Sequence, residues 1–218
     1  MGIYVFDAYG TLFDVHAAIG RFRAEAGPDA DRMSDIWRTK QLEYTWVLTL
    51  AGHYADFWTL TERALDYALA RVPSVPKALK PKLMDAYYKL DAFPDAVAAL
   101  RTLKAKGHKT GTLSNGSPKM LASAVQSAGI AGDLDALLSV DVLKMFKARP
   151  EVYALVTDHY KCAPADVTFV SSNRWDVMAA VSVGFRTYWI NRARLPDEYL
   201  DFPPMQTLSD LTSLAEAA

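Results

Sequence analysis

Short apolar or β-rich segments recur along this chain, and helical patterns separate the later ones. The segments lie at 3–7, 109–113, 135–139, 167–171 and 186–190. Apolar residues recur at helical spacing in the intervals 95–106, 119–128, 149–159 and 176–183. Strand and helix in alternation are typical of a parallel sheet covered by helices on both faces. Since such crossovers are right-handed, the sequence predicts an α/β fold with a Rossmann-like parallel sheet flanked by helices.

The stretch between the first two segments breaks this rhythm. It contains no convincing strand, and its apolar residues recur at spacings near one helical turn: Ile36, Trp37, Leu42, Trp46 and Leu50, then Phe57, Leu60, Ala64 and Leu65. A chain of 218 residues is long enough for a core that carries an inserted subdomain. We therefore expect a block of amphipathic helices inserted directly after the first strand.

Composition argues against several kinds of partner. The formal net charge is -1, so we expect no electrostatic attraction to nucleic acid or to an anionic membrane. No apolar run approaches the ~20 residues that cross a bilayer, and Asp7 comes too early for the apolar region of a signal peptide. Cys162 is the only cysteine, which excludes an intrachain disulfide and a cysteine-based metal cluster. The simplest interpretation is a cytoplasmic protein.

The first apolar segment ends in Asp7, and Gly10 shortly afterwards lets the chain turn sharply. Ligand sites in open α/β sheets lie at the carboxyl ends of strands, so Asp7 is a candidate nucleophile. The run from Asp7 to Thr11 resembles the opening motif of the haloacid dehalogenase superfamily, whose members attack substrate with such an aspartate. Most of that superfamily are phosphatases with a second aspartate two residues later, where this chain has Tyr9. A phenol is a poor acid near neutral pH and a poor neighbour for Mg²⁺, which argues against phosphoryl transfer.

The inserted helical block is similar to the helical cap of the same superfamily. The resemblance implies a cap subdomain over 15–91 and a Rossmann-like core domain over 1–14 and 92–218. A cap above the edge of the sheet would exclude water and supply side chains from above.

Two further positions at the ends of expected strands carry polar groups. Ser114 and Asn115 form a turn before a helix, and their hydroxyl and free backbone N–H groups suit an anion; an ordinary turn is the alternative. Lys147 precedes a helix that Pro150 can open. A lysine aimed at a carboxylate nucleophile would keep it charged, although a solvated loop lysine is the commoner case. Lys144 and Arg149 compete for that role, as nearby cations.

The fourth apolar segment is followed by neutral residues. In metal-dependent members of the superfamily that this chain resembles, the corresponding loop begins with Gly-Asp and continues with acidic residues that hold Mg²⁺. This chain has Ser171, Ser172 and Asn173 there, all of them neutral. Mg²⁺ is usually held by one or two carboxylates together with substrate phosphates and water. In this chain only Asp7 and Asp176 remain as an obvious pair of carboxylates for that role. The sequence therefore predicts neither a metal nor another cofactor.

Five motifs in this order resemble the bacterial L-2-haloacid dehalogenases: residues 6–14, 37–44, 113–116, 146–153 and 171–176. The resemblance covers nearly the whole chain. It implies an aspartate that displaces halide from C2 of a short haloalkanoic acid with inversion and without metal, after which water hydrolyses the aspartyl ester. It also implies a homodimer, with the haloacid and halide as small-molecule partners.

Residue roles follow from the same resemblance. Catalytic roles fall to Asp7, Thr11, Arg38, Lys147, Ser171, Asn173 and Asp176. Substrate contacts fall to Tyr9, Arg38, Leu42, Phe57, Ser114, Asn115, Tyr153 and Trp175, with Tyr153 and Ser171 also organising the polar shell. Arg38 would reach from the cap towards the leaving halide, and Lys147 would pair with Asp7. Thr11 would hydrogen-bond Asp7 or the hydrolytic water, which Asn173 and Asp176 would position.

Several alternatives stay open. The same fold also suits a Mg²⁺-dependent phosphatase on a small metabolite, or a catalytically silent relative that binds a protein or a small acid. Arg38 would form a surface ion pair with Asp35 or Glu43 if it had no role in the site. Arg174 is a candidate second anion contact. The aromatic residues Trp37, Tyr44 and Trp46 suit either a dimer contact or the core of the cap.

Overall fold

The computed structural model describes residues 2–217 and contains a six-stranded sheet in the order β3-β2-β1-β4-β5-β6, with every neighbouring pair parallel. The strands are β1 (Ile3–Phe6), β2 (Lys109–Ser114), β3 (Ala136–Ser139), β4 (Val167–Ser171), β5 (Arg186–Ile190) and β6 (Gln206–Leu208). The predicted parallel α/β sheet is confirmed. The edge strand β6 was not predicted, because three residues carry too little pattern to be recognised.

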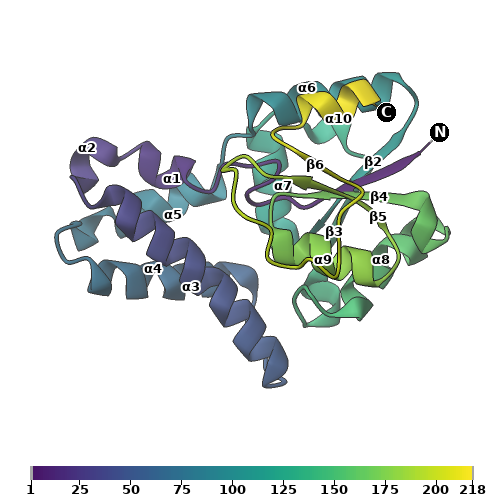
Figure 1. Ribbon diagram of the computed structural model, residues 1–218. Coiled ribbons are helices and arrows are strands. Elements are labelled where there is room, and N and C mark those ends of the chain that lie inside the picture. The colour runs from purple at the N-terminus through teal and green to yellow at the C-terminus, as the bar shows by residue number, and fades with distance from the viewer. Residues whose placement is uncertain (1, 218) are drawn as a thin grey trace.

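Helices cover both faces of the sheet (Figure 1). On one face lie α6 (Pro94–Ala105) and α10 (Thr212–Ala217), and on the other lie α8 (Pro150–Tyr160) and α9 (Arg174–Ser182). A further helix, α7 (Pro118–Ser127), packs against β3. The buried faces of β1 and β4 supply the centre of the core with Val5, Phe6, Phe169 and Val170, all fully buried.

A group of helices separates β1 from α6 and lies beyond one end of the sheet (Figure 1). It consists of α1 (Ala17–Gly20), α2 (Arg23–Ala26), α3 (Ala30–Leu50), α4 (Phe57–Arg71) and α5 (Lys80–Tyr88). The long helices α3 and α4 pack against each other, and the Asp56 side chain caps α4 by accepting from the Thr59 N–H at 3.1 Å. We call residues 15–91 the helical insert; its boundaries as a separate subdomain stay a prediction.

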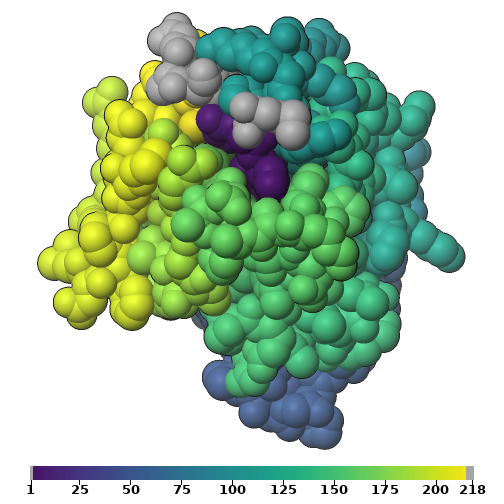
Figure 2. Space-filling view, turned by 90° about the vertical axis from the view of Figure 1, so that its right-hand side faces the viewer, coloured from purple at the N-terminus to yellow at the C-terminus, as the bar shows by residue number. Residues whose placement is uncertain are grey.

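The two connections between the insert and the core run side by side. Phe13 forms an isolated antiparallel bridge with Ala92, and the Phe93 N–H donates to Leu12 O at 2.8 Å. Figure 2 shows the core from the side opposite the insert: a small purple area, the start of the chain, lies between teal and green segments, and a blue segment of the insert, near residue 50, projects below the core. Within residues 2–217, no helix combines the length and apolar character needed to cross a membrane.

Candidate active site

The carboxyl end of β1 places Asp7 between two other strand ends. Phe6 is in register with Thr112 of β2 and Val170 of β4, and the Asp7 N–H donates to Val170 O at 2.9 Å. The chain then turns at Gly10, whose φ of +96° lies in the region that favours glycine. This turn brings the Thr11 hydroxyl back to Asp7 Oδ2, to which it donates at 3.0 Å.

Lys147 bridges the two predicted carboxylates. Its Nζ lies 3.0 Å from Asp7 Oδ1 and 2.8 Å from Asp176 Oδ2, and its side chain is only 1% exposed. Its backbone N–H donates to Asn115 Oδ1 at 3.0 Å, which fixes the loop against the β2 turn. The competing cations lie elsewhere, since Lys144 pairs with Asp141 and Arg149 pairs with Glu151.

Burial and charge oppose each other in this group. Burial alone would lower the pKa of the Lys147 ammonium, but Asp176 and Asp7 outweigh it and raise that pKa above its usual range. Burial raises the pKa of the Asp176 carboxyl, against the opposing effect of Lys147. Burial likewise holds the pKa of the Tyr9 phenol well above its usual range. Tyr9 is therefore a neutral wall of the site near pH 7.

Polar side chains orient the two aspartates. Asn173 Nδ2 donates to Asp7 Oδ2 at 2.8 Å, so this oxygen accepts from both Thr11 and Asn173. The Tyr153 hydroxyl donates to Asp176 Oδ1 at 2.6 Å. The Ser171 hydroxyl accepts from the Asn173 N–H at 3.1 Å, which positions the start of α9. These contacts fix the direction of each carboxylate oxygen.

A small, partly enclosed cavity lies in front of Asp7. Its lining residues are Asp7, Tyr9, Arg38, Leu42, Phe57, Ser114, Asn115, Asn173 and Trp175. The volume of this cavity is about 10 Å³, which is room for about one water molecule. A Cβ at Gly116 would lie 2.6 Å from the Tyr9 ring, so glycine there lets the ring form one wall. The insert and the core together enclose the nucleophile.

Arg38 reaches into this cavity from α3. Its Nη2 donates to Tyr9 O at 3.0 Å and to Asn173 Oδ1 at 3.3 Å, and its Nη1 donates to Gln41 Oε1 at 2.8 Å. The alternative of a surface ion pair for Arg38 is therefore wrong. The two carboxylates Asp7 and Asp176 face two cations, Lys147 and Arg38, so the formal charges of the site balance before an anion arrives.

The structure brings most of the predicted site together, with two differences. Tyr153 was predicted to contact substrate, but it does not line the cavity. Its hydroxyl donates to Asp176 instead, because α8 lies behind Lys147. The alternative of Arg174 as a second anion contact is wrong. Its Nε pairs with Asp197 Oδ1 at 2.6 Å, and its Nη2 donates to Tyr199 O at 2.6 Å and Phe202 O at 3.0 Å. Arg174 thus anchors the loop after β5.

Sequence reasoning missed two residues that contact the site. Tyr87 of α5 stacks on the Tyr9 ring with centroids 5.8 Å apart. Gln41 receives the hydrogen bond from Arg38. The available signal for Gln41 was its place one helical turn after Arg38, amid apolar residues of the same helix face.

The donor set does not favour a bound metal. Among the residues that the structure describes, no three His, Cys, Asp or Glu side chains are grouped so that they could hold a metal ion. The space between Asp7 and Asp176 is taken by the ammonium of Lys147. A divalent cation there would have to displace a buried positive charge.

Comparison with known proteins gives consistent results. The haloacid dehalogenase-like hydrolase family matches residues 1–184. The (S)-2-haloacid dehalogenase 1 of Pseudomonas sp. (strain CBS-3) is 45% identical over 213 residues, covering 97% of this chain and 94% of that protein. A crystal structure of a dehalogenase superposes with a TM-score of 0.97 at 42% identity, covering 100% of this chain and 97% of the other. The L-2-haloacid dehalogenase of Xanthobacter autotrophicus with chloropropionic acid covalently bound gives a TM-score of 0.89 at 34% identity, with 99% and 97% covered.

Proposed function

The chain belongs to the haloacid dehalogenase-like hydrolase family, and from that premise we propose that it converts short L-2-haloalkanoic acids to 2-hydroxyalkanoic acids. The observation that carries the proposal is the small cavity that Asp7 and Arg38 line together with apolar walls. Tyr9 stands where a phosphatase of this fold has its acid. Relatives similar over nearly their whole length are named for this activity.

In the first step, an oxygen of Asp7 attacks C2 from the side opposite the halogen. A new carbon–oxygen bond forms as the carbon–halogen bond breaks, and the halide leaves with the electron pair and inverts the configuration. The halide leaves as an anion without being protonated, so this step needs no general acid at the position of Tyr9. Positioning of this kind supplies about 7–11 kcal/mol of barrier reduction, and the guanidinium of Arg38 stabilises the departing charge.

The substrate carboxylate is assigned to the turn after β2. Ser114 and Asn115 line the cavity beside Asp7, and the Ser114 hydroxyl already accepts from the Gly116 N–H at 3.0 Å. The backbone N–H groups of Tyr9 and Asn115 complete this anion site in our proposal. The alkyl group then lies against the apolar walls, which are Tyr9, Leu42, Phe57 and Trp175.

In the second step, water attacks the carbonyl carbon of the Asp7 ester. The bond between that carbon and the product oxygen breaks, and the 2-hydroxy acid leaves with an oxygen that came from Asp7. One proton of the water ends on the product hydroxyl, the other is released to solvent, and Asp7 is again a carboxylate. Asn173 and Asp176 position the water or the lysine, and Thr11 orients the carboxyl group. The ammonium of Lys147, 3.0 Å from Asp7 Oδ1, stabilises the negative charge that develops on the carbonyl oxygen of the ester.

We further propose that the reaction needs no metal, since Lys147 supplies the positive charge beside Asp7. Halide release from L-2-chloropropionate or monochloroacetate is expected to continue unchanged in EDTA. Ion chromatography of released halide, with and without EDTA, checks this. No halide from any two- to four-carbon haloacid would contradict the proposed function. Phosphate release that EDTA abolishes, without dehalogenation, would favour the Mg²⁺-dependent phosphatase instead.

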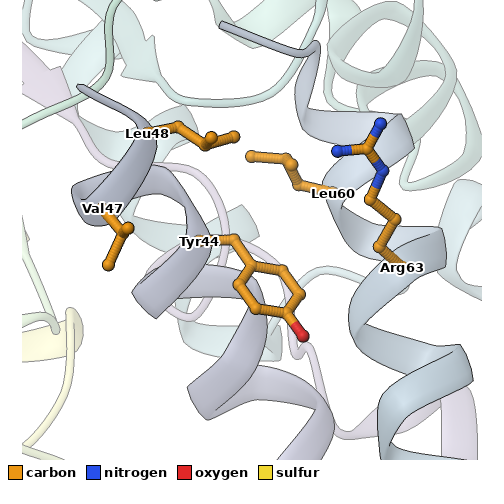
Figure 3. Close-up of a pocket in the computed structure, with 5 residues that line it drawn as sticks. All are labelled: Tyr44, Val47, Leu48, Leu60 and Arg63. Atoms are coloured by element: carbon orange, nitrogen blue, oxygen red, sulfur yellow. The ribbon is translucent and has the colours of Figure 1, made fainter. Parts of the chain in front are cut away.

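A homodimer is part of the proposal, and an apolar groove on the insert supports it. The groove is lined by Tyr44, Val47 and Leu48 of α3 with Leu60 and Arg63 of α4 (Figure 3). Leu50, at the end of the same helix, is 84% exposed. Trp37 plays no part, because it is buried and donates to Thr61 O at 2.8 Å.

The expected mass in solution is therefore that of two chains, and Leu50→Glu is expected to shift it towards one by placing a charge in the apolar contact. Light scattering after size-exclusion chromatography measures both. A monomeric parent protein at micromolar concentration would contradict this part of the proposal.

A cytoplasmic location stays a prediction, supported by the single free cysteine, Cys162.

A further inference from the structure

A buried polar network in the helical insert holds the guanidinium of Arg38. Gln41 lies one turn further along α3 and is 1% exposed. Its Oε1 accepts from Arg38 Nη1 at 2.8 Å, and its Nε2 donates to Thr61 Oγ1 at 2.7 Å. The Tyr87 hydroxyl lies 2.9 Å from the same nitrogen. Gln41 therefore ties α3, α4 and α5 to one charged group of the active site.

The network is extended and satisfied at its far end. Thr61 Oγ1 donates onward to Phe57 O at 2.7 Å, within the same helix. The Tyr87 hydroxyl also lies 3.1 Å from Gln41 Oε1, and its ring stacks on Tyr9. A buried amide with all its partners in place has one orientation, because turning it would leave buried polar groups unpaired. Gln41 thus presents its oxygen to Arg38 in a fixed direction.

That direction matters because a guanidinium is a planar fork on a long, flexible side chain. Arg38 is held from the core side by Tyr9 O and Asn173 Oδ1 and from the insert side by Gln41. Contacts from both sides define the plane of the fork, and Arg38 in this position lines the cavity beside Asp7. Removing the insert-side contact would let the fork rotate away from the position that the leaving halide will occupy.

We propose that Gln41 is a positioning residue for carbon–halogen cleavage and acts through Arg38. This inference rests on the proposed dehalogenation and assigns one of its steps to a residue outside the cavity. Arg38 stabilises negative charge on the departing halide, and that charge is more concentrated on chloride than on bromide. A misdirected guanidinium therefore slows chloride departure more than bromide departure.

Gln41→Met keeps the side-chain length and removes the acceptor for Arg38. Single-turnover halide release is measured with L-2-chloropropionate and L-2-bromopropionate. The chloride rate is expected to fall about tenfold, less than the 10²-fold or more lost when a stabilising donor is itself removed. The bromide-to-chloride rate ratio is expected to rise at least about threefold, with KM changed by less than about twofold, since ground-state binding is kept.

Two controls separate positioning from a general loss of structure. Leu69→Val removes buried apolar packing from α4 and is expected to leave the rate ratio unchanged. In the double variant Arg38→Lys with Gln41→Met, the loss is expected to be smaller than the product of the two single losses, because both act on one contact. If Gln41→Met does not fold, Gln41→Asn withdraws the amide from Arg38 and carries the same expectations.

An unchanged rate ratio in a folded Gln41 variant overturns the inference, as does an equal change in Leu69→Val. A double variant whose losses multiply in full also overturns it. These outcomes all require a parent enzyme that releases halide. A parent enzyme that releases none contradicts the proposed function itself, so the two failures are distinguishable.

Discussion

Asp7→Asn is expected to lower kcat for halide release by about 10⁴-fold or more, because a neutral amide oxygen is not a competent nucleophile. The substitution keeps the shape of the side chain and removes its charge. Asp14→Asn is the matched control, since Asp14 lies in the same loop and its carboxylate accepts from the His16 N–H rather than facing the cavity. The control is expected to retain activity within a few-fold. Comparable turnover in both variants would contradict the assignment of Asp7.

Isotope labelling tests how Asp7 acts. In a single turnover in ¹⁸O-water, the label is expected in the Asp7 carboxylate and not in the product hydroxyl, because water attacks the ester carbonyl. Mass spectrometry of the peptide that contains Asp7, and of the hydroxy acid, measures both. Label in the product hydroxyl alone would mean that water attacks C2 directly, with Asp7 as a general base.

The residues at strand ends could be predicted from the sequence because their placement follows from the topology. Asp7, Ser114 and Ser171 each end or follow a strand, and parallel strands in register bring such ends to one edge. Lys147 is different. It lies in a loop whose path depends on long-range contacts such as its N–H bond to Asn115 Oδ1. The residues alone therefore made it one of three candidate cations, and only the family resemblance chose it over Lys144 and Arg149.

The residues that were missed or misread depend on tertiary contacts without a local pattern. Gln41 is a polar residue on a helix, which suggests a surface position, yet it is buried by two neighbouring helices. Arg174 was a candidate anion contact because it precedes Trp175, the expected aromatic wall of the pocket. Its actual partners, among them Asp197, belong to a loop more than twenty residues away, whose return to α9 no periodicity encodes.

Removing the ammonium that separates the two buried aspartates is expected to cost both stability and activity. In Lys147→Met, Asp7 and Asp176 would share a nearly dry site without the cation that lies between them, since their side chains are 8% and 0% exposed. Breaking such a buried group typically destabilises a protein by about 3–5 kcal/mol. We also expect kcat to fall by about 10²-fold or more, because the nucleophile loses its fixed direction. Urea unfolding and halide release measure the two effects.

Lys144→Met is the matched control, because the Lys144 side chain is 59% exposed and its ion pair with Asp141 is expected to contribute less than about 1 kcal/mol.

The loss of stability in Lys147→Met is expected to shrink as the pH falls. Burial raises the pKa of Asp176, and without the lysine this carboxyl binds a proton in the folded state more readily than in the unfolded state. The free energy of unfolding of Lys147→Met is therefore higher at acid pH, and it falls as the pH rises through the raised pKa of Asp176.

A second substitution separates the structural role of Lys147 from its catalytic one. Adding Asp176→Asn to Lys147→Met removes one of the two opposing charges, so most of the lost stability is expected to return. Turnover is expected to stay low, because nothing then fixes Asp7 Oδ1 or stabilises charge on the ester. A double variant that regains both stability and turnover would show that the lysine only neutralises the site. Because Asp176 has its own proposed role in positioning the water, the single variant Asp176→Asn is the reference. Recovered stability with turnover well below that of Asp176→Asn would place Lys147 in the chemistry itself.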